Sequence, residues 1–303
     1  MDAFFTVLAY IAIIVIGQLF RLLEIFPRAS IRPMSMLVLY VTLPCSIVTF
    51  LYGVPLSAEL IAPFLTAFCA NWILIGAAAF LTRHSNDKAH DVPFAMLNLS
   101  GYNVGTFAMP YTAGIVSPIG FLSICLFDAG NSLMCTGGTY AFACRDGKRS
   151  FCAQLANIAK RLATSAPIWT YLAMLSIGIA GIEIPKPFLH FFEIVGKANP
   201  FLAMLLIGLS VNLRIDFAKF RPLIKLLFWR YVINAAIAVL CFWLMPVSEE
   251  IRKALLLVMM APMPAMGLVF TMKANLDWET AANLNSLSVI VSVIIMSTLL
   301  AIL

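Results

Sequence analysis

The chain has 303 residues, of which 62% are apolar and 11% are charged, whereas about 25% of the residues of a soluble domain are charged. This composition excludes a soluble globular enzyme, a nucleic-acid-binding protein and a disordered scaffold, and it predicts an all-α polytopic membrane protein. The net charge of +6 is attributed to membrane orientation, because cytoplasmic loops retain Lys and Arg.

Apolar segments follow one another along the whole chain, and each approaches the length of about 20 residues that spans a bilayer. The first segment has no basic residue before it, so we interpret it as a retained helix and not as a signal peptide. The segments predict ten transmembrane helices, at 4–20, 34–52, 60–81, 92–115, 119–144, 166–181, 188–211, 222–245, 251–272 and 281–303.

The basic residues concentrate in alternate connections between these segments. Sixteen of the 20 Lys and Arg residues fall in the odd-numbered connections and their margins. The positive-inside rule then predicts that these connections are cytoplasmic and that both termini lie outside the plasma membrane, which in a bacterium is the inner membrane. The sixteen are Arg21, Arg28, Arg32, Arg83, Lys88, Arg145, Lys148, Arg149, Lys160, Arg161, Arg214, Lys219, Arg221, Lys225, Arg230 and Lys273.

The longest connection, residues 145–165, divides the chain into two halves of five helices each, residues 1–144 and 166–303. Apolar residues recur at helical spacing within it, which predicts an amphipathic helix on the inner membrane surface. Because five is odd, the second half must insert upside down, as in the inverted repeats of many secondary transporters. Pro44 and Pro200 predict interruptions at similar places in the second and seventh segments.

The fourth and ninth segments contain helix-breaking residues near mid-membrane. Gly and Pro interrupt the apolar run in residues 98–110 and 259–267. Unpaired backbone groups are costly in lipid, so such breaks persist only against protein or a wet cavity. Two breaks at matching places predict one shared cavity, with positive half-helix N-termini that suit an anion. Simple kinks, which are frequent in membrane helices, are the alternative interpretation.

Asn103 is the polar candidate in the first break, since its amide can donate to a carboxylate and accept from a hydroxyl. Its other role would be to cap the following half-helix, and the two roles are compatible. The second break has no Asn, so its contribution would come from Pro262, Pro264 and backbone groups. Met263 would help to line a deformable apolar pocket, or would only fill a gap in the packing.

Asp128 lies near the middle of the fifth segment, whereas the other acids lie in loops, in tails or near helix ends. A carboxylate at the bilayer centre costs about 2.5–3.5 kcal/mol, so it should face protein or water. This placement predicts a proton or cation coupling site that Asn131, one turn away, would share. A neutral structural acid that is hydrogen-bonded to Asn131 is the alternative. A polar stripe of Asn and Ser in the tenth segment is typical of packing between helices.

Short motifs occur in an order that resembles the auxin efflux carrier family of permeases. They are Asn-Val-Gly at 103–105, Met-Pro at 109–110, Gly-Lys-Ala-Asn-Pro at 196–200, Leu-Leu-Ile-Gly-Leu-Ser at 205–210, Ala-Pro-Met-Pro-Ala at 261–265, and Thr-Met-Lys-Ala-Asn at 271–275. The compact cytoplasmic connection is similar to that of prokaryotic members, which are associated with malate, malonate and other organic acids.

The resemblance implies a fold shared with bile-acid symporters and sodium/proton antiporters, in which the broken fourth and ninth helices cross. Substrate would bind beside the crossing, between a scaffold and a transport domain. By motif, the site residues would be Asn103, Pro110, and Pro262 or Pro264, and we expect Gly105, two residues after Asn103, in the substrate site as well. Related carriers can place an Asn in the ninth-helix break, where this chain has Ala265 and Met266.

The sequence therefore predicts a secondary active transporter of small mono- or dicarboxylates that works by alternating access and is coupled to a proton or another cation. A carrier like the sodium/proton antiporters or the bile-acid symporters is the alternative. An enzyme is not expected, because the spans lack converging acid–base groups. We expect no cofactor and no metal site, and we leave monomer and homodimer open.

Overall fold

The computed structural model describes residues 2–83, 92–144, 156, 159–160, 162–211 and 217–303. Within these ranges the secondary structure is helical and contains no strand. Six helical segments are long and apolar enough to cross a bilayer, and two shorter apolar helices cover Pro118–Leu133 and Ala166–Ala180. The expectation of an all-helical polytopic membrane protein is thereby confirmed. The six segments are Phe4–Leu22, Ile31–Leu51, Ala58–Thr82, Lys186–Ser210, Leu223–Leu244 and Trp278–Ile302.

The helices of the described residues are, in chain order, α1 (Asp2–Leu22), η1 (Arg28–Ser30), α2 (Ile31–Leu37), η2 (Val38–Thr42), α3 (Leu43–Leu51), η3 (Ala58–Leu60), α4 (Ile61–Thr82), α5 (Val92–Leu99), η5 (Val104–Ala108), α6 (Met109–Thr112), α7 (Pro118–Leu133), η6 (Met134–Gly138), α8 (Thr139–Ala143), α10 (Ala166–Ala180), α11 (Lys186–Ser210), α12 (Phe217–Leu244), α13 (Glu249–Val258), α14 (Ala265–Lys273) and α15 (Trp278–Ile302). The short elements η2, η5 and η6 are π-helical.

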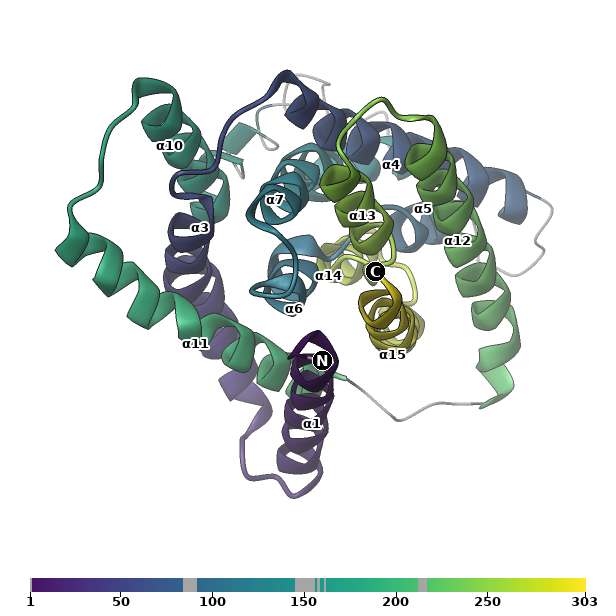
Figure 1. Cartoon of the computed structure of the whole chain (residues 1–303). Coiled ribbons are helices and arrows are strands. Elements are labelled where there is room, and N and C mark those ends of the chain that lie inside the picture. The colour runs from purple at the N-terminus through teal and green to yellow at the C-terminus, as the bar shows by residue number, and fades with distance from the viewer. Residues whose placement is uncertain (1, 84–91, 145–155, 157–158, 161, 212–216) are drawn as a thin grey trace.

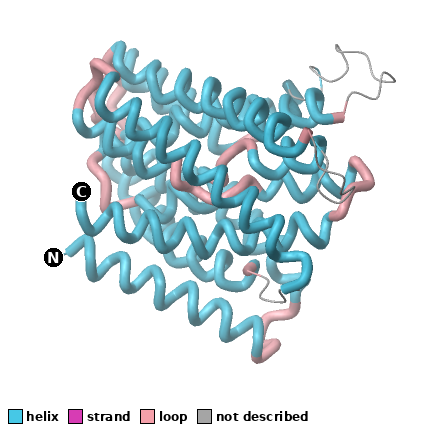
Figure 2. The backbone as a smooth tube through the Cα atoms, turned by 90° about the vertical axis from the view of Figure 1, so that its right-hand side faces the viewer, coloured by secondary structure: helices cyan, strands magenta, loops and turns pink. Residues whose placement is uncertain are grey.

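The helices form two groups that lie side by side (Figure 1). In one group, α11 packs against α1 and α3, and α10 packs against α3. In the other, α7 packs against α4 and α13, while α5 packs against α4 and α14 and α12 packs against α13. Figure 2 shows that α1 begins and α15 ends at the same end of the bundle. The broken helices thus belong to the second group, and part of their surface faces the first.

Glycines permit backbone contact between helices inside each group. A Cβ atom on Gly208 of α11 would lie 2.1 Å from the carbonyl oxygen of Ile14 in α1. A Cβ atom on Gly130 of α7 would lie 2.3 Å from the carbonyl oxygen of Phe64 in α4. Small residues of this kind let membrane helices pack at van der Waals distance. Each group is therefore tightly packed within itself.

The interruptions predicted at Pro44 and Pro200 are milder than expected. Helix α11 continues through Pro200, and Pro44 occupies the first turn of α3, directly after the π-helical turn η2. A proline removes one backbone donor, and a helix packed against neighbours can tolerate that loss. The two regions do meet, because Thr42 Oγ1 donates a hydrogen bond of 2.9 Å to Asn199 Oδ1.

Arg230 lies elsewhere than the sequence predicted. We expected it at the margin of a cytoplasmic connection, but it lies midway along α12 and is 0% exposed. We placed it at the margin because an isolated charge within an apolar segment is unfavourable in lipid. In the structure, backbone carbonyls accept hydrogen bonds from the guanidinium, which makes the buried position possible. The predicted amphipathic helix at 145–165 falls largely outside the described residues.

Candidate functional site

The first helix break comprises residues 100–103, between the end of α5 at Leu99 and the start of η5 at Val104. Gly101 has a φ of +83°, which is favourable for glycine alone. The space is also restricted, because a Cβ atom there would lie 2.5 Å from Cys135 Sγ and 2.9 Å from Pro264 Cγ. The helix is interrupted here because Gly101 reverses the backbone where it lies in close contact with Cys135 and Pro264.

The second break comprises residues 259–264, between the end of α13 at Val258 and the start of α14 at Ala265. Pro262 and Pro264 carry no N–H group, so this segment has two fewer donors to satisfy. The two breaks are joined directly, since the Asn103 N–H donates a hydrogen bond of 2.9 Å to the carbonyl of Pro262. The two broken helices therefore contact each other at their breaks, and this point of contact is called the crossing below.

Asn131 of α7 satisfies the backbone of the first break. Its Oδ1 accepts from the Tyr102 N–H at 3.0 Å, and its Nδ2 donates to the Tyr102 carbonyl at 2.8 Å. The amide thus replaces both backbone partners that Tyr102 would have in a continuous helix. Asn131 was predicted to share a coupling site with Asp128, and its bonds show in addition that it supports the break.

Serines of α15 satisfy the second break. Ser292 Oγ donates to the carbonyl of Met260 at 2.7 Å, and Ser288 Oγ accepts from the Met263 N–H at 3.1 Å. Part of the polar stripe predicted in the last segment thus serves in packing. Further carbonyls at the crossing, those of Leu99, Gly101 and Ala261, accept hydrogen bonds from Arg230. The breaks persist against protein, as the cost of unpaired groups in lipid requires.

The larger of two cavities at the crossing has a volume of about 500 Å³. It lies between the two helix groups, with η2 and the start of α10 on one side and the breaks and α7 on the other. Its lining consists of Ser35, Leu39, Tyr40, Tyr102, Asn103, Val104, Gly105, Thr106, Asp128, Asn131, Ser132, Cys135, Thr164, Ser165, Ala166, Pro167, Pro264, Ala265 and Met266.

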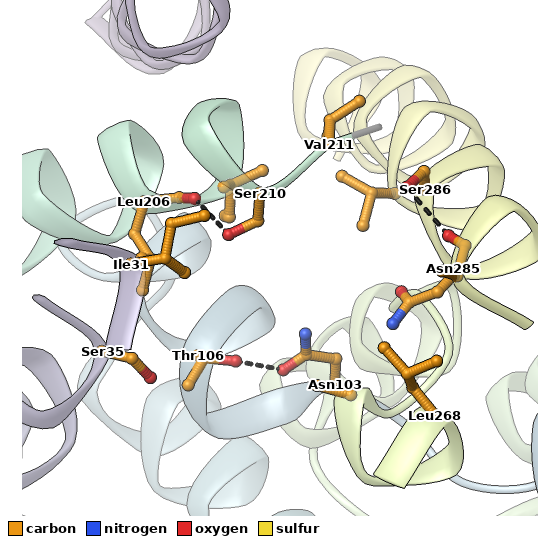
Figure 3. A pocket seen from close by; sticks show the side chains of 14 residues that line it. Ile31, Ser35, Asn103, Thr106, Leu206, Ser210, Val211, Leu268, Asn285 and Ser286 are labelled. Carbon is orange, nitrogen blue, oxygen red and sulfur yellow. Dashed lines mark hydrogen bonds between the residues drawn. The ribbon is translucent and has the colours of Figure 1, made fainter. Parts of the chain in front are cut away.

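The smaller cavity, about 340 Å³ in volume, lies between α2, the end of α11, η5 and α15 (Figure 3). Thr106 Oγ1 donates a hydrogen bond of 2.5 Å to Asn103 Oδ1. The Asn103 nitrogen consequently points away from Thr106 and into the cavity, toward which the amide of Asn285 also projects. Ser35, Asn103, Thr106 and Ala265 line both cavities, so the two meet at Asn103.

Asp128 is 9% exposed and faces the larger cavity. The Tyr171 hydroxyl of α10 donates to Asp128 Oδ2 at 3.3 Å, and the same hydroxyl lies 3.2 Å from Met109 Sδ. This contact joins α10 of one helix group to α7 of the other. Sequence reasoning missed Tyr171, because a single tyrosine in an apolar segment gives no local signal of a partner.

The predicted site residues divide into two sets. Asn103, Gly105 and Pro264, together with Asp128 and Asn131, line the larger cavity. Three others are buried without lining either cavity, and two of these act through their backbone. Pro110 lies within α6, Pro262 accepts from Asn103, and Met263 donates to Ser288.

Comparison with known proteins adds one relative. The chain is 26% identical over 217 residues to a protein named "Uncharacterized transporter" from Methanothermobacter thermautotrophicus, and the match covers 69% of this chain and 68% of the relative. The chain is similar to a transporter. No family model matches the sequence. With the apolar helices described above, this similarity supports a multi-pass membrane protein.

Proposed function

We propose that the protein is a secondary active transporter of small organic anions that works by alternating access. The observation that carries the proposal is the crossing of two broken helices beside cavities that lie between two helix groups. Irregular backbone at membrane depth is typical of substrate sites in transporters built from discontinuous helices. Relative movement of the two groups would open the cavities to alternate sides of the membrane.

The lining of the cavities suits a small carboxylate. Among the described lining residues there is no Lys or Arg, and Asp128 is the one acid. The Asn103 amide nitrogen, hydroxyls such as that of Ser35, and the first-turn N–H groups of η5 and α14 are the available donors. Positive helix N-termini favour anions. Volumes of about 340 and 500 Å³ match pockets for small molecules.

We further propose that the chain belongs to the auxin efflux carrier family and has ten helices in two inverted repeats of five. The matched breaks support this arrangement, and so does the contact between the Pro44 and Pro200 regions through Thr42 and Asn199. On this proposal both termini lie outside the bacterial inner membrane. Reporter tags in 145–149 and 214–219 would then be cytoplasmic, and a cytoplasmic C-terminus would contradict the ten-helix topology.

Asp128 is the proposed binding site for the coupling proton or cation. The carboxyl lines the same cavity as Asn103 and Gly105, so an ionised Asp128 and a substrate carboxylate would repel each other there. Protonation, or occupation by a cation such as sodium, would remove that repulsion and favour binding. The same observation favours a second candidate function, a carrier like the sodium/proton antiporters with Asp128 as the ion carrier.

A binding screen followed by flux measurements tests these functions. Purified protein is screened for thermal stabilisation by mono- and dicarboxylates at two pH values, because a ligand of the folded state raises its stability. Proteoliposomes are then assayed for labelled malate uptake and for sodium flux. Stabilisation and uptake of a carboxylate support anion transport. Sodium flux without carboxylate binding would replace it with the antiporter function.

A further inference from the structure

Among the described residues, two charged side chains are buried, those of Arg230 and Asp128. Its Nη1 donates to the carbonyl of Leu99, and its Nη2 donates to the carbonyls of Gly101 at 2.7 Å and Ala261 at 3.3 Å. Leu99 and Gly101 belong to the first break region, whereas Ala261 belongs to the second. One guanidinium therefore bonds to both broken helices.

These carbonyls also explain how a charge is tolerated at this depth. Arg230 forms no ion pair with a carboxylate in the part of the chain that the structure describes. Its acceptors instead lie at the C-terminal end of α5 and just beyond the C-terminal ends of α5 and α13, and each helix C-terminus carries roughly half a negative charge. Two such ends match the single positive charge of one guanidinium. A planar guanidinium with several donors also suits acceptors that come from different directions.

We infer that Arg230 is a positioning residue that fixes the two broken helices to each other through its charge, by neutralising the ends of both preceding half-helices. It does not line either cavity, so it does not act as a direct anion ligand. The inference concerns the crossing itself and does not depend on which substrate the protein carries.

The surroundings of Arg230 support this role. The guanidinium carbon lies 5.1 Å from the ring centroid of Tyr102, which is within the range of a cation–π contact. The Tyr102 hydroxyl donates a hydrogen bond of 2.9 Å to Asn234 Oδ1, one turn along α12. Helix α12 thus contacts the first break through Arg230 and Asn234, and the Arg230 guanidinium also bonds to the second break.

Cys135 is a native reporter of this geometry. Its thiol lies at the point where Gly101 and Pro264 meet, and it lines the larger cavity. The experiment uses the full chain with the other six of its seven cysteines replaced by serine. The rate of Cys135 labelling by a maleimide is measured in purified protein for Arg230→Lys, Arg230→Gln and Arg230→Met. Folding is checked by gel filtration and thermal unfolding.

We expect the Gln and Met variants to label at least about tenfold faster than the parent, because they lack the charge that holds the crossing closed. Lys keeps the charge and should remain within about threefold of the parent. Arg252→Met is the matched control, since Arg252 donates to the carbonyl of Phe242 away from the crossing. Its labelling rate should equal that of the parent.

The remaining outcomes also decide the matter. Gln and Met variants that fail to fold while the Lys variant folds would support the proposal, because the charge would then be the required feature. A Met variant that labels as slowly as the parent would overturn it. A Lys variant that labels like Met, or that fails to fold together with Gln and Met, would also overturn it, because charge alone would then not be sufficient.

Discussion

The first break, residues 100–103, retains its backbone N–H groups and contributes Tyr102 and Asn103 to the cavities, whereas the second break, residues 259–264, contributes only Pro264 among its described residues. The second break removes two of its own donors with proline. The N–H groups of Met259, Met260 and Ala261 donate to carbonyls of α13, and serines of α15 bond to the Met263 N–H and the Met260 carbonyl. At the first break, the side-chain amide of Asn131 in α7 bonds to both the N–H and the carbonyl of Tyr102. On the proposed function, the first break would supply the groups that recognise the substrate, whereas the second break would supply only part of the cavity wall.

Crowding at the first break predicts the largest effect on stability. Gly101→Ala introduces a positive-φ strain of about 1–2 kcal/mol and an overpacking cost of about 1–3 kcal/mol against Cys135 and Pro264. The Cys135 thiol can rotate away, but the proline ring cannot. We expect a total loss of about 3 kcal/mol, measured by thermal unfolding in detergent.

Gly53→Ala is the matched control for this substitution. Gly53 has a φ of +75°, close to that of Gly101, but nothing lies within 4 Å of the added Cβ. Its cost should be the backbone term alone, about 1 kcal/mol. Equal destabilisation by the two substitutions would show that contact between the breaks contributes nothing to the conformation of Gly101.

Asp128→Asn tests whether the acid beside the first break couples transport to a cation. Asn keeps the size and the hydrogen bonding of the protonated acid but releases no proton. The variant should fold and bind substrate, and it should lose concentrative, pH-driven uptake in proteoliposomes while retaining exchange. Cys125→Ser, on the same helix and buried away from both cavities, is the control. A flux–pH profile that matches the parent would remove Asp128 from the mechanism.

Asn103→Ala tests the recognition role of the first break. Loss of a hydrogen bond to a charged group is worth about 1.5–3 kcal/mol, so substrate affinity should fall about ten- to hundredfold while the protein stays folded. Thr106→Val removes a cavity-lining hydroxyl and the bond that orients the Asn103 amide but keeps the amide itself, and we expect a smaller loss of affinity from it. Titration of a carboxylate against purified protein measures both. Unchanged affinity in Asn103→Ala would leave the residue as a helix cap.

The sequence allowed the helical segments, both breaks and five residues that line the larger cavity to be predicted, because their signals are local. The five are Asn103, Gly105, Asp128, Asn131 and Pro264. Apolar length, Gly and Pro within an apolar run, and an isolated acid can each be recognised without a partner. The partners of Arg230 and Tyr171 could not be predicted in this way. Each residue bonds to groups that are remote in sequence. The acceptors of Arg230 are in addition backbone carbonyls, which every residue carries, so the residue type at those positions does not indicate them. The ten-helix inverted repeat stays a prediction.

Ser288→Ala should have the smallest effect and tests the other half of the comparison. The substitution removes the acceptor of the Met263 N–H and leaves that donor buried, which costs about 1–3 kcal/mol. Because the Ser288 hydroxyl also donates to the Asn285 carbonyl, which can bond within α15, we expect a value near the lower limit. Substrate affinity should not change, since Ser288 and Met263 line neither cavity. Thermal unfolding and carboxylate titration on the same preparation measure the two quantities. An affinity loss as large as that of Asn103→Ala would show that the second break also takes part in recognition. A serine that only supports the backbone of the break contributes equally to the free and the substrate-bound protein, so its loss should not change substrate affinity.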